Sequence, residues 1–194
     1  MDEFTFVGYT LREKFYPKCF PEYANRCKIT DCKEMYSIDE ALLPEVPPYN
    51  QCYFESYGEF TNRTTFSFEY DNMKKHLDDK NIIIGCFIET CAISAVKWEF
   101  QSDGEPLFSY AQVNNIQISP ELKHRGYEVV SNRDYKISAN TNCDFKKDEL
   151  QKYGKVTCGL LFENYNSAIK FRDHLNTCNI TAHEPFSIWQ IWTL

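Results

Sequence analysis

The stretch "VNNIQISPELKHRGYEVV", Val113 to Val130, decides how the fold of this chain is interpreted. It begins as an apolar, β-branched segment and then meets Pro120, which cannot donate a hydrogen bond within a strand. Three basic or potentially basic residues and Gly126 follow. Because glycine lets a backbone approach an anion closely, this order predicts a strand, a phosphate-binding loop and a weak helix over residues 126–137. The alternative is an ordinary charged turn between a strand and a helix.

The segments around this stretch predict a sheet covered by helices. Alternating or β-branched runs indicate strands at residues 3–11, 51–60, 64–70, 81–89, 91–100, 108–119, 155–163 and 185–194. Capping residues and apolar periodicity indicate helices at residues 71–79, 146–154 and 166–176, together with a short helix that Ser37 caps. We therefore expect an α+β fold with a mixed, mostly antiparallel sheet flanked by helices, in a single domain over residues 1–194.

Two motifs in the second half of the chain resemble the GNAT superfamily of N-acyltransferases. The run "NNIQISPELKHRG", residues 114–126, is similar to the family's strand and cofactor loop. The run "LLFENYNSAIKFRDHL", residues 160–175, is similar to its later strand, Asn and helix. The resemblance implies a GNAT-like fold over residues 81–194 and leaves residues 1–80 unassigned. It also implies transfer of an acyl group from acetyl-coenzyme A to an amine of a small molecule or a protein.

The same resemblance assigns roles to particular residues. Backbone N–H groups at a helix N-terminus would hold the pyrophosphate of acetyl-coenzyme A, because they are unpaired and carry a partial positive charge. The residues expected there are Lys123, His124, Arg125, Gly126 and Tyr127. Asn164 or Asn166 would contact the pantetheine side of the cofactor, and Arg172 would place a positive charge near the phosphate or the thiolate.

Acyl transfer also needs a general base, because an ammonium must lose a proton before it attacks a thioester. Glu89 and Glu99 lie on predicted strands ahead of the loop and are the leading candidates for this base, acting through a water molecule. Glu163, near the end of the later predicted strand, is a further candidate. His124 and His174 carry side chains that could serve in the same way.

Two residues depart from the family's pattern and favour a different function. Glu128 stands where the family has a small residue, and its carboxylate would repel a phosphate. Arg172 stands where the family often has a Tyr that acts as general acid, and an Arg does not release a proton near neutral pH. The alternative function is therefore a non-catalytic, acidic binding or inhibitor protein on a degenerate GNAT-like fold or another α+β fold.

The composition limits the kinds of partner and the cellular compartment that we expect. A net charge of −7 without a basic stripe argues against binding to nucleic acid. The N-terminus is acidic and no long apolar run follows, so we expect a cytoplasmic protein that does not cross a membrane. The nine cysteines form no CxxC pair, which predicts reduced thiols. The spacing of Cys19, Cys27 and Cys32 is wider than in most structural zinc sites, so no metal site is predicted.

Overall fold

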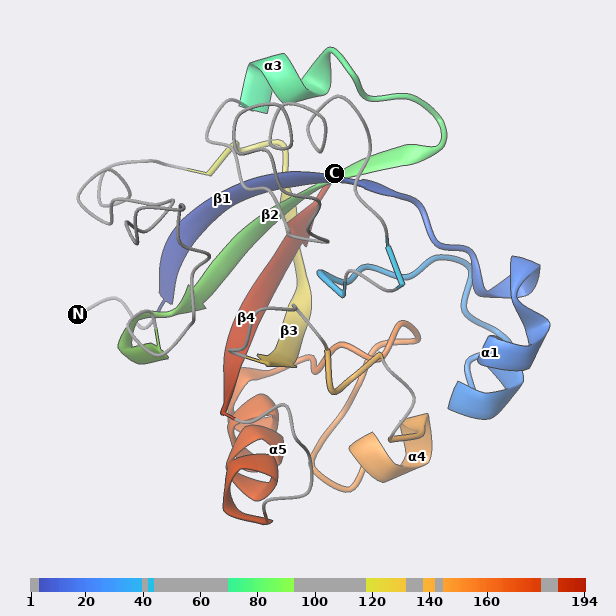
Figure 1. The fold of residues 1–194 in the computed structure, drawn as a ribbon, viewed down its shortest axis with the longest axis vertical. Coiled ribbons are helices and arrows are strands. Elements are labelled where there is room, and N and C mark those ends of the chain that lie inside the picture. Colours follow the sequence, from blue (N-terminus) through green and yellow to red (C-terminus); the bar gives the residue numbers. More distant parts are fainter. Residues whose placement is uncertain are drawn as a thin grey trace, which may run out of the picture.

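The computed structural model describes residues 4–39, 42–43, 70–92, 118–131, 138–141, 145–178 and 185–194. Its centre is a four-stranded antiparallel sheet with the order β1-β2-β4-β3 (Figure 1). The strands are β1 Phe4–Glu13, β2 Asn81–Glu89, β3 Lys123–Ser131 and β4 Phe186–Thr193. Helices accompany the sheet, so the α+β class is confirmed, whereas the GNAT-like arrangement stays a prediction.

Three of the four strands were expected from the sequence, at residues 3–11, 81–89 and 185–194. β1 pairs with β2 from Phe4–Glu89 to Glu13–Asn81, with a bulge between Phe6 and Gly8. β2 pairs with β4 from Ile84–Thr193 to Ile88–Trp189. The β-branched and aromatic residues of these segments suit a pleated surface that is buried on both faces.

The helix expected over residues 126–137 is wrong in its first part, because Lys123–Ser131 is the strand β3. This strand pairs with β4 from Lys123–Thr193 to Ser131–Phe186. Val129 and Val130 are completely buried, and β-branched residues fit a sheet better than a helix. Packing against β4 therefore overrides the weak helical tendency of the segment.

The described residues include four α-helices, which are α1 Pro21–Cys27, α3 Tyr70–Lys74, α4 Lys147–Leu150 and α5 Tyr165–Cys178. Two short 3₁₀ turns lie at Pro17–Cys19 and Thr90–Ala92. The helix predicted at residues 166–176 is confirmed by α5, whereas those predicted at 71–79 and 146–154 are shorter than expected. Ile38 and Asp39, which follow Ser37, are not helical; the Ser37 hydroxyl donates to Glu128 and accepts from the backbone N–H of Asp39 at 2.9 Å. Part of the helix expected there lies outside the described residues.

The strand expected at residues 155–163 is mainly a turn. Val156 and Phe162 form an isolated bridge, and the N–H of Thr157 donates to the carbonyl of Leu161 at 2.8 Å. Leu160 has a φ of 71°, which reverses the chain. Buried apolar residues make this turn look like a buried strand in the sequence. Most of the other expected strand residues, at 51–60, 64–69, 93–100 and 108–117, lie outside the described residues.

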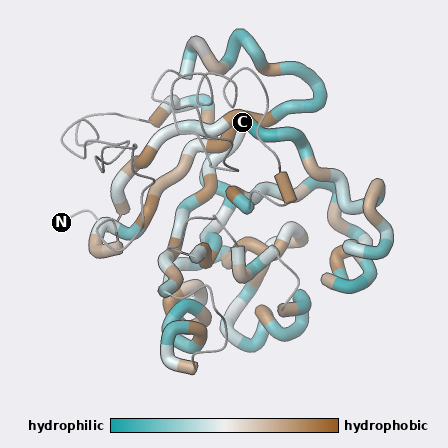
Figure 2. The backbone as a smooth tube through the Cα atoms, in the orientation of Figure 1, coloured by the Kyte–Doolittle hydropathy of each residue, from teal (hydrophilic) through white to brown (hydrophobic). Residues whose placement is uncertain are grey.

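The sheet contributes to two groups of buried apolar side chains. The larger group joins all four strands with α1, α4 and α5. The smaller group joins β1 and β2 with Met73 on α3 and with Leu122 just before β3. Figure 2 shows the corresponding pattern along the chain, with hydrophobic stretches on the strands and hydrophilic ones on α1 and α3. This packing fixes the positions of the side chains on the strands and on α1 and α5.

The redox state predicted for all nine cysteines does not hold at Cys27 and at the cysteine bonded to it. Cys27 is disulfide-bonded, so the prediction of reduced thiols is wrong at this position. Disulfides are typical of oxidising compartments, and the cytoplasmic location stays a prediction. No helix within the described part of the chain is long and apolar enough to span a bilayer.

Candidate functional site

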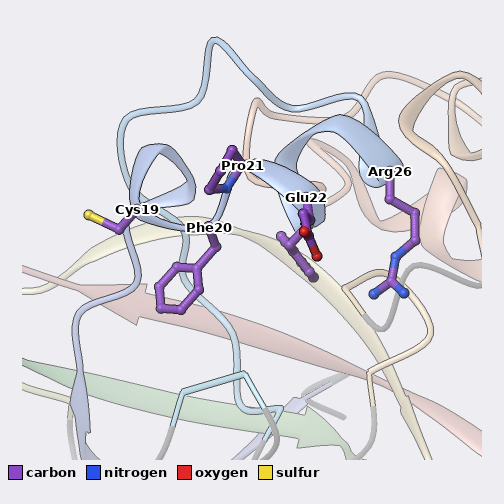
Figure 3. Close-up of a pocket in the computed structure, with 6 residues that line it drawn as sticks. Cys19, Phe20, Pro21, Glu22 and Arg26 are labelled. Carbon is purple, nitrogen blue, oxygen red and sulfur yellow. The ribbon is translucent and has the colours of Figure 1, made fainter.

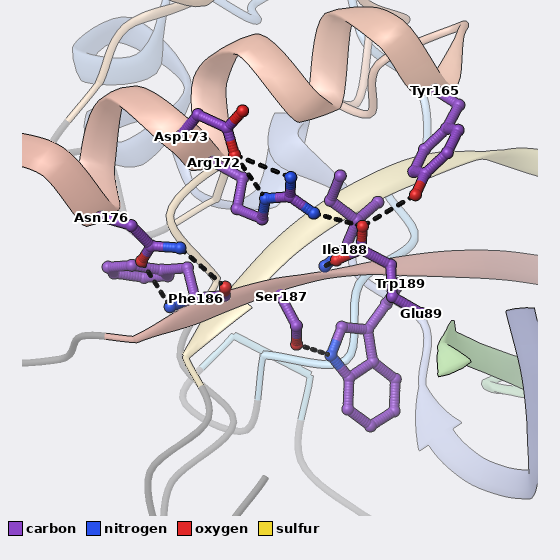
Figure 4. A network of polar contacts seen from close by, with 9 residues as sticks. All are labelled: Glu89, Tyr165, Arg172, Asp173, Asn176, Phe186, Ser187, Ile188 and Trp189. Carbon is purple, nitrogen blue, oxygen red and sulfur yellow. Dashed lines mark hydrogen bonds and ion pairs between the residues drawn. The ribbon is translucent and has the colours of Figure 1, made fainter. Parts of the chain in front are cut away.

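A partly buried ion pair between Glu89 and Arg172 joins the end of β2 to α5, and it brings together two residues that the sequence singled out (Figure 4). One carboxylate oxygen of Glu89 accepts hydrogen bonds from the Arg172 guanidinium and from the Tyr165 hydroxyl, the latter at 2.8 Å. The other oxygen accepts a hydrogen bond from the backbone N–H of Ile188 at 2.8 Å. Tyr165 and Arg172 are seven residues apart on α5, which places both on the face toward Glu89.

The surroundings of Arg172 favour its charged form. Burial disfavours the charge of Arg172, but hydrogen bonds to Glu89 and Asp173 outweigh it and raise the Arg172 pKa above its ordinary value. The Glu89 side chain is only 1% exposed and already accepts three hydrogen bonds. A general base has to reach the proton that it removes. The geometry of Glu89 therefore suits an anchor for α5 better than an open base.

Aromatic rings lie beside this ion pair in a continuous row on the sheet. The Tyr165 ring lies 4.9 Å from that of Phe4 and 5.7 Å from that of Tyr127. His124 continues the row, at 4.8 Å from Tyr127 and 5.2 Å from Trp192. Partial desolvation lowers the pKa of His124 below its ordinary value, although the residue is exposed near the start of β3. Two of the predicted cofactor residues, His124 and Tyr127, thus share a surface with Tyr165.

The remaining residues of the predicted phosphate loop have other partners. Arg125 donates to the Thr193 hydroxyl at 2.6 Å and to the Leu194 carbonyl. The N–H of Tyr127 donates to the Phe162 carbonyl at 2.9 Å, so it does not belong to an open helix N-terminus. Lys123 is exposed at the start of β3. The local structure expected for this loop is therefore wrong.

Gly126 meets a packing requirement in β3. Its φ is +144°, in a region that side chains rarely adopt, and it lies at the bulge between His124 and the rest of the strand. A Cβ atom here would lie 2.8 Å from both the Leu161 Cβ and the Phe162 carbonyl oxygen. The structure thus explains this glycine by the close approach of the neighbouring turn.

Two of the other predicted site residues lie at the start of α5, and one lies outside the described residues. Asn164 begins α5, where its side-chain oxygen accepts hydrogen bonds from the N–H and the hydroxyl of Ser167, each at 2.9 Å. Asn166 is exposed on the first turn of α5. Glu99 lies outside the described residues.

Glu128 occupies a completely buried polar centre on the opposite face of β3 from Tyr127. It accepts hydrogen bonds from the Ser37 hydroxyl and, at 3.0 Å, from the backbone N–H of Ile38. Burial raises the pKa of Glu128 to about 7, although hydrogen bonds from Ser37, Ser138 and Ile38 oppose that rise. Its carboxyl group points into the protein, so it does not face a bound phosphate.

A surface pocket of about 560 Å³ lies beside α1 and was missed by the sequence analysis (Figure 3). Its lining includes Cys19, Phe20, Pro21, Glu22, Tyr23 and Arg26. Volumes of this size are typical of sites for small molecules. The only signal in the sequence was the spacing of Glu22 and Arg26, which places opposite charges one helical turn apart.

The wall of this α1 pocket is aromatic. The Phe20 ring is 51% exposed and stacks on Phe15, with ring centres 4.7 Å apart. The Tyr23 ring meets Phe15 edge-on at 5.2 Å, and its hydroxyl donates to the Thr141 carbonyl at 2.5 Å. Burial raises the pKa of Tyr23, so the phenol stays protonated. These contacts fix the rings before any ligand arrives.

Two charged residues, Glu22 and Arg26, line the α1 pocket beside its aromatic wall. Phe20, Glu22 and Arg26 extend to the same side of α1 (Figure 3). Neither Glu22 nor Arg26 forms an ion pair with another described residue, although an (i, i+4) spacing would allow one. The pocket therefore combines a cation, an anion and an apolar wall.

Comparisons with models of protein families, with curated proteins and with solved structures found no match.

Proposed function

We propose that this chain is a non-catalytic binding protein whose α1 pocket takes a small zwitterion, an α-amino acid with an apolar side chain. The observation that carries the proposal is the pair of opposite charges, Glu22 and Arg26, on the lining of a pocket with an aromatic wall. An α-amino acid carries a carboxylate, an ammonium and a side chain on one carbon. It therefore offers one group to each part of this lining.

Each contact has a physical basis. The planar Arg26 guanidinium can donate two parallel hydrogen bonds to a carboxylate, which is the strongest polar contact in the pocket. The Glu22 carboxylate can accept from the ammonium group. The exposed face of Phe20 removes apolar ligand surface from water, at about 25 cal/mol per Å². Phe15 and Thr141 hold the aromatic wall in place, so its side chains lose little conformational entropy when a ligand binds.

Acyl transfer from acetyl-coenzyme A to an amine is a second proposal. The observation that favours it is that Tyr165 contacts both Glu89 and Tyr127, while Arg172 donates to the same Glu89 oxygen as Tyr165. In this proposal the Tyr165 hydroxyl would protonate the departing thiolate, which is the role that the family gives to a Tyr. The α1 pocket has no part in it.

Titration calorimetry with a truncated ligand series tests the first proposal. L-Phenylalanine should bind with a dissociation constant of about 0.1 mM, as expected for a ligand of this size. Phenylethylamine lacks the carboxylate and 3-phenylpropanoate lacks the ammonium, so each should bind at least about tenfold more weakly. A titration with acetyl-coenzyme A tests the second proposal. Binding of acetyl-coenzyme A with no binding of L-phenylalanine would overturn the first proposal.

Variants locate the binding. Arg26→Gln should weaken L-phenylalanine binding by about tenfold or more, because a charge-assisted hydrogen bond contributes about 1.5–3 kcal/mol. Glu22→Gln should weaken phenylethylamine binding but leave 3-phenylpropanoate binding unchanged. Lys152→Gln is the matched control, because Lys152 is exposed in the turn after α4 and does not line the α1 pocket.

A further inference from the structure

Two thiols that are distant in the sequence lie in contact at the surface of the molecule. The Cys32 thiol donates a hydrogen bond to the Cys158 sulfur, and the two sulfur atoms are 3.0 Å apart. Cys32 is only 2% exposed, whereas Cys158 is exposed to solvent. The two residues are separated by 126 positions along the chain. From this geometry we infer that Cys32 and Cys158 form a reversible disulfide when the protein meets a low-molecular-weight disulfide.

The backbone already holds both cysteines in place. The segment after Cys32 is tied to the end of β1, because the N–H of Met35 donates to the Phe15 carbonyl at 3.0 Å. The turn that carries Cys158 is closed by the hydrogen bond from Thr157 to Leu161. A Cβ atom on Gly159 would lie 3.5 Å from the Cα of Met35, so the two segments lie close together.

The covalent step requires only a small movement. A disulfide has a sulfur–sulfur distance of about 2.05 Å, so the two sulfur atoms have to approach by about 1 Å. Rotation of the buried Cys32 side chain and the exposed Cys158 side chain can supply this approach without moving a strand. A contact at 3.0 Å between two thiols is therefore a preformed dithiol site.

The different environments of the two thiols set the order of reaction. Burial, followed by the hydrogen bond to Cys158, raises the pKa of Cys32 to about 12, so Cys32 keeps its proton. The accessible Cys158 thiolate attacks first, because thiolates are the nucleophiles and access controls the rate. Cys32 then acts as the resolving thiol.

The reaction balances with oxidised glutathione as the oxidant. The Cys158 thiolate attacks one sulfur of glutathione disulfide, which forms a Cys158–glutathione mixed disulfide and releases one glutathione thiolate. Cys32 loses its proton and attacks the Cys158 sulfur, which breaks the mixed disulfide and releases the second glutathione. The two protein protons end on the two glutathione thiols. The protein has lost two electrons and glutathione disulfide has gained them.

Mass spectrometry of the full chain tests this site. The protein is equilibrated in glutathione redox buffer, quenched with acid, alkylated and digested. We expect a linked pair of peptides that contain Cys32 and Cys158. Cys32→Ser should trap a glutathione adduct on Cys158, and Cys158→Ser should leave Cys32 alkylated. Cys91→Ser is the control, because Cys91 is an exposed thiol outside this pair, and it should keep the linked peptides.

A stability measurement supports the mass analysis. Closing a loop of this length should raise the melting temperature of the oxidised wild type by about 5–10 °C over oxidised Cys158→Ser. The comparison is made under identical oxidising conditions, so that the Cys27 disulfide is the same in both proteins. The inference is overturned by a lasting glutathione adduct on wild-type Cys158, by linkage of Cys32 to another cysteine, or by two alkylated thiols after equilibration.

Discussion

The carboxylate of Glu128 on β3 accepts a hydrogen bond from the backbone N–H of Ile38 at 3.0 Å, in a site without solvent exposure. This contact joins β3 to a segment 90 residues earlier in the chain. The sequence suggested that the Glu128 carboxylate would repel a bound phosphate. The hydrogen bond from Ile38 shows that this carboxylate points into the protein. Glu128 belongs to the internal polar packing of the protein.

Glu128→Gln should remove a pH dependence from the free energy of unfolding. The native state raises the pKa of Glu128 from 4.5 to about 7, so it binds more protons than the unfolded state between these values. Its stability contribution is therefore full below about pH 4.5 and falls as the pH rises through 7. From pH 4.5 to pH 8, the wild type should lose about 3 kcal/mol more than Glu128→Gln in chemical denaturation.

A matched control has the opposite sign. Glu121 is an exposed carboxylate whose pKa is lowered by its hydrogen bond to Lys74. The stability that this shift contributes is present above the unfolded-state pKa of Glu121 and is lost as the pH falls. Glu121→Gln should therefore slightly reduce the loss of unfolding free energy on acidification. If Glu128→Gln loses as much free energy of unfolding between pH 4.5 and pH 8 as the wild type, Glu128 does not have the raised pKa of a buried acid.

Gly126→Ala should destabilise the fold by about 2–4 kcal/mol, measured as a shift of the urea midpoint at constant slope. The φ of +144° disfavours any side chain, and the new Cβ would lie 2.8 Å from Leu161 and Phe162. Gly159→Ala is the control. Its Cβ would meet Met35 at an ordinary 3.5 Å, so its effect should stay within about 0.5 kcal/mol. Equal effects of the two variants would contradict the close approach at Gly126.

Arg172→Ala should cost about 3 kcal/mol in equilibrium unfolding, because it leaves the Glu89 carboxylate buried without its cation. Glu89→Gln in the Arg172→Ala background should recover part of this loss, since it removes the uncompensated charge. Lys155→Ala removes one partner of the exposed pair with Glu163 and should cost less than about 1 kcal/mol. A loss of similar size for Lys155→Ala and Arg172→Ala would argue against a buried anchor.

The parts of the fold that the sequence predicted have a strong local signal. β1, β2 and β4 are rich in aromatic and β-branched residues, and α5 has apolar residues at helical spacing behind the Asn164 cap. β3 was missed because its first residues, "KHRG", are charged and contain a glycine, which resembles a loop. Only the pairing with β4 makes this segment a strand, and that pairing is not a local property.

The candidate sites depend even more on contacts between distant segments. Glu89 and Arg172 were each singled out, but their 83-residue separation hides the pairing from the sequence. The same holds for the thiols of Cys32 and Cys158. The α1 pocket was missed because a short helix with one Glu and one Arg is also what a solvated helix looks like. Its wall becomes recognisable only when Phe15 stacks on Phe20.

The most direct test of the proposed function is an NMR titration of isotope-labelled protein with L-phenylalanine. The proposal predicts saturable shifts of the backbone amides of Phe20 and of residues 22–26, and their disappearance in Arg26→Gln. Shifts centred on His124, Tyr127 and the Trp192 indole N–H would place the ligand on the aromatic row instead. That result, or no shift at millimolar ligand, would contradict binding in the α1 pocket.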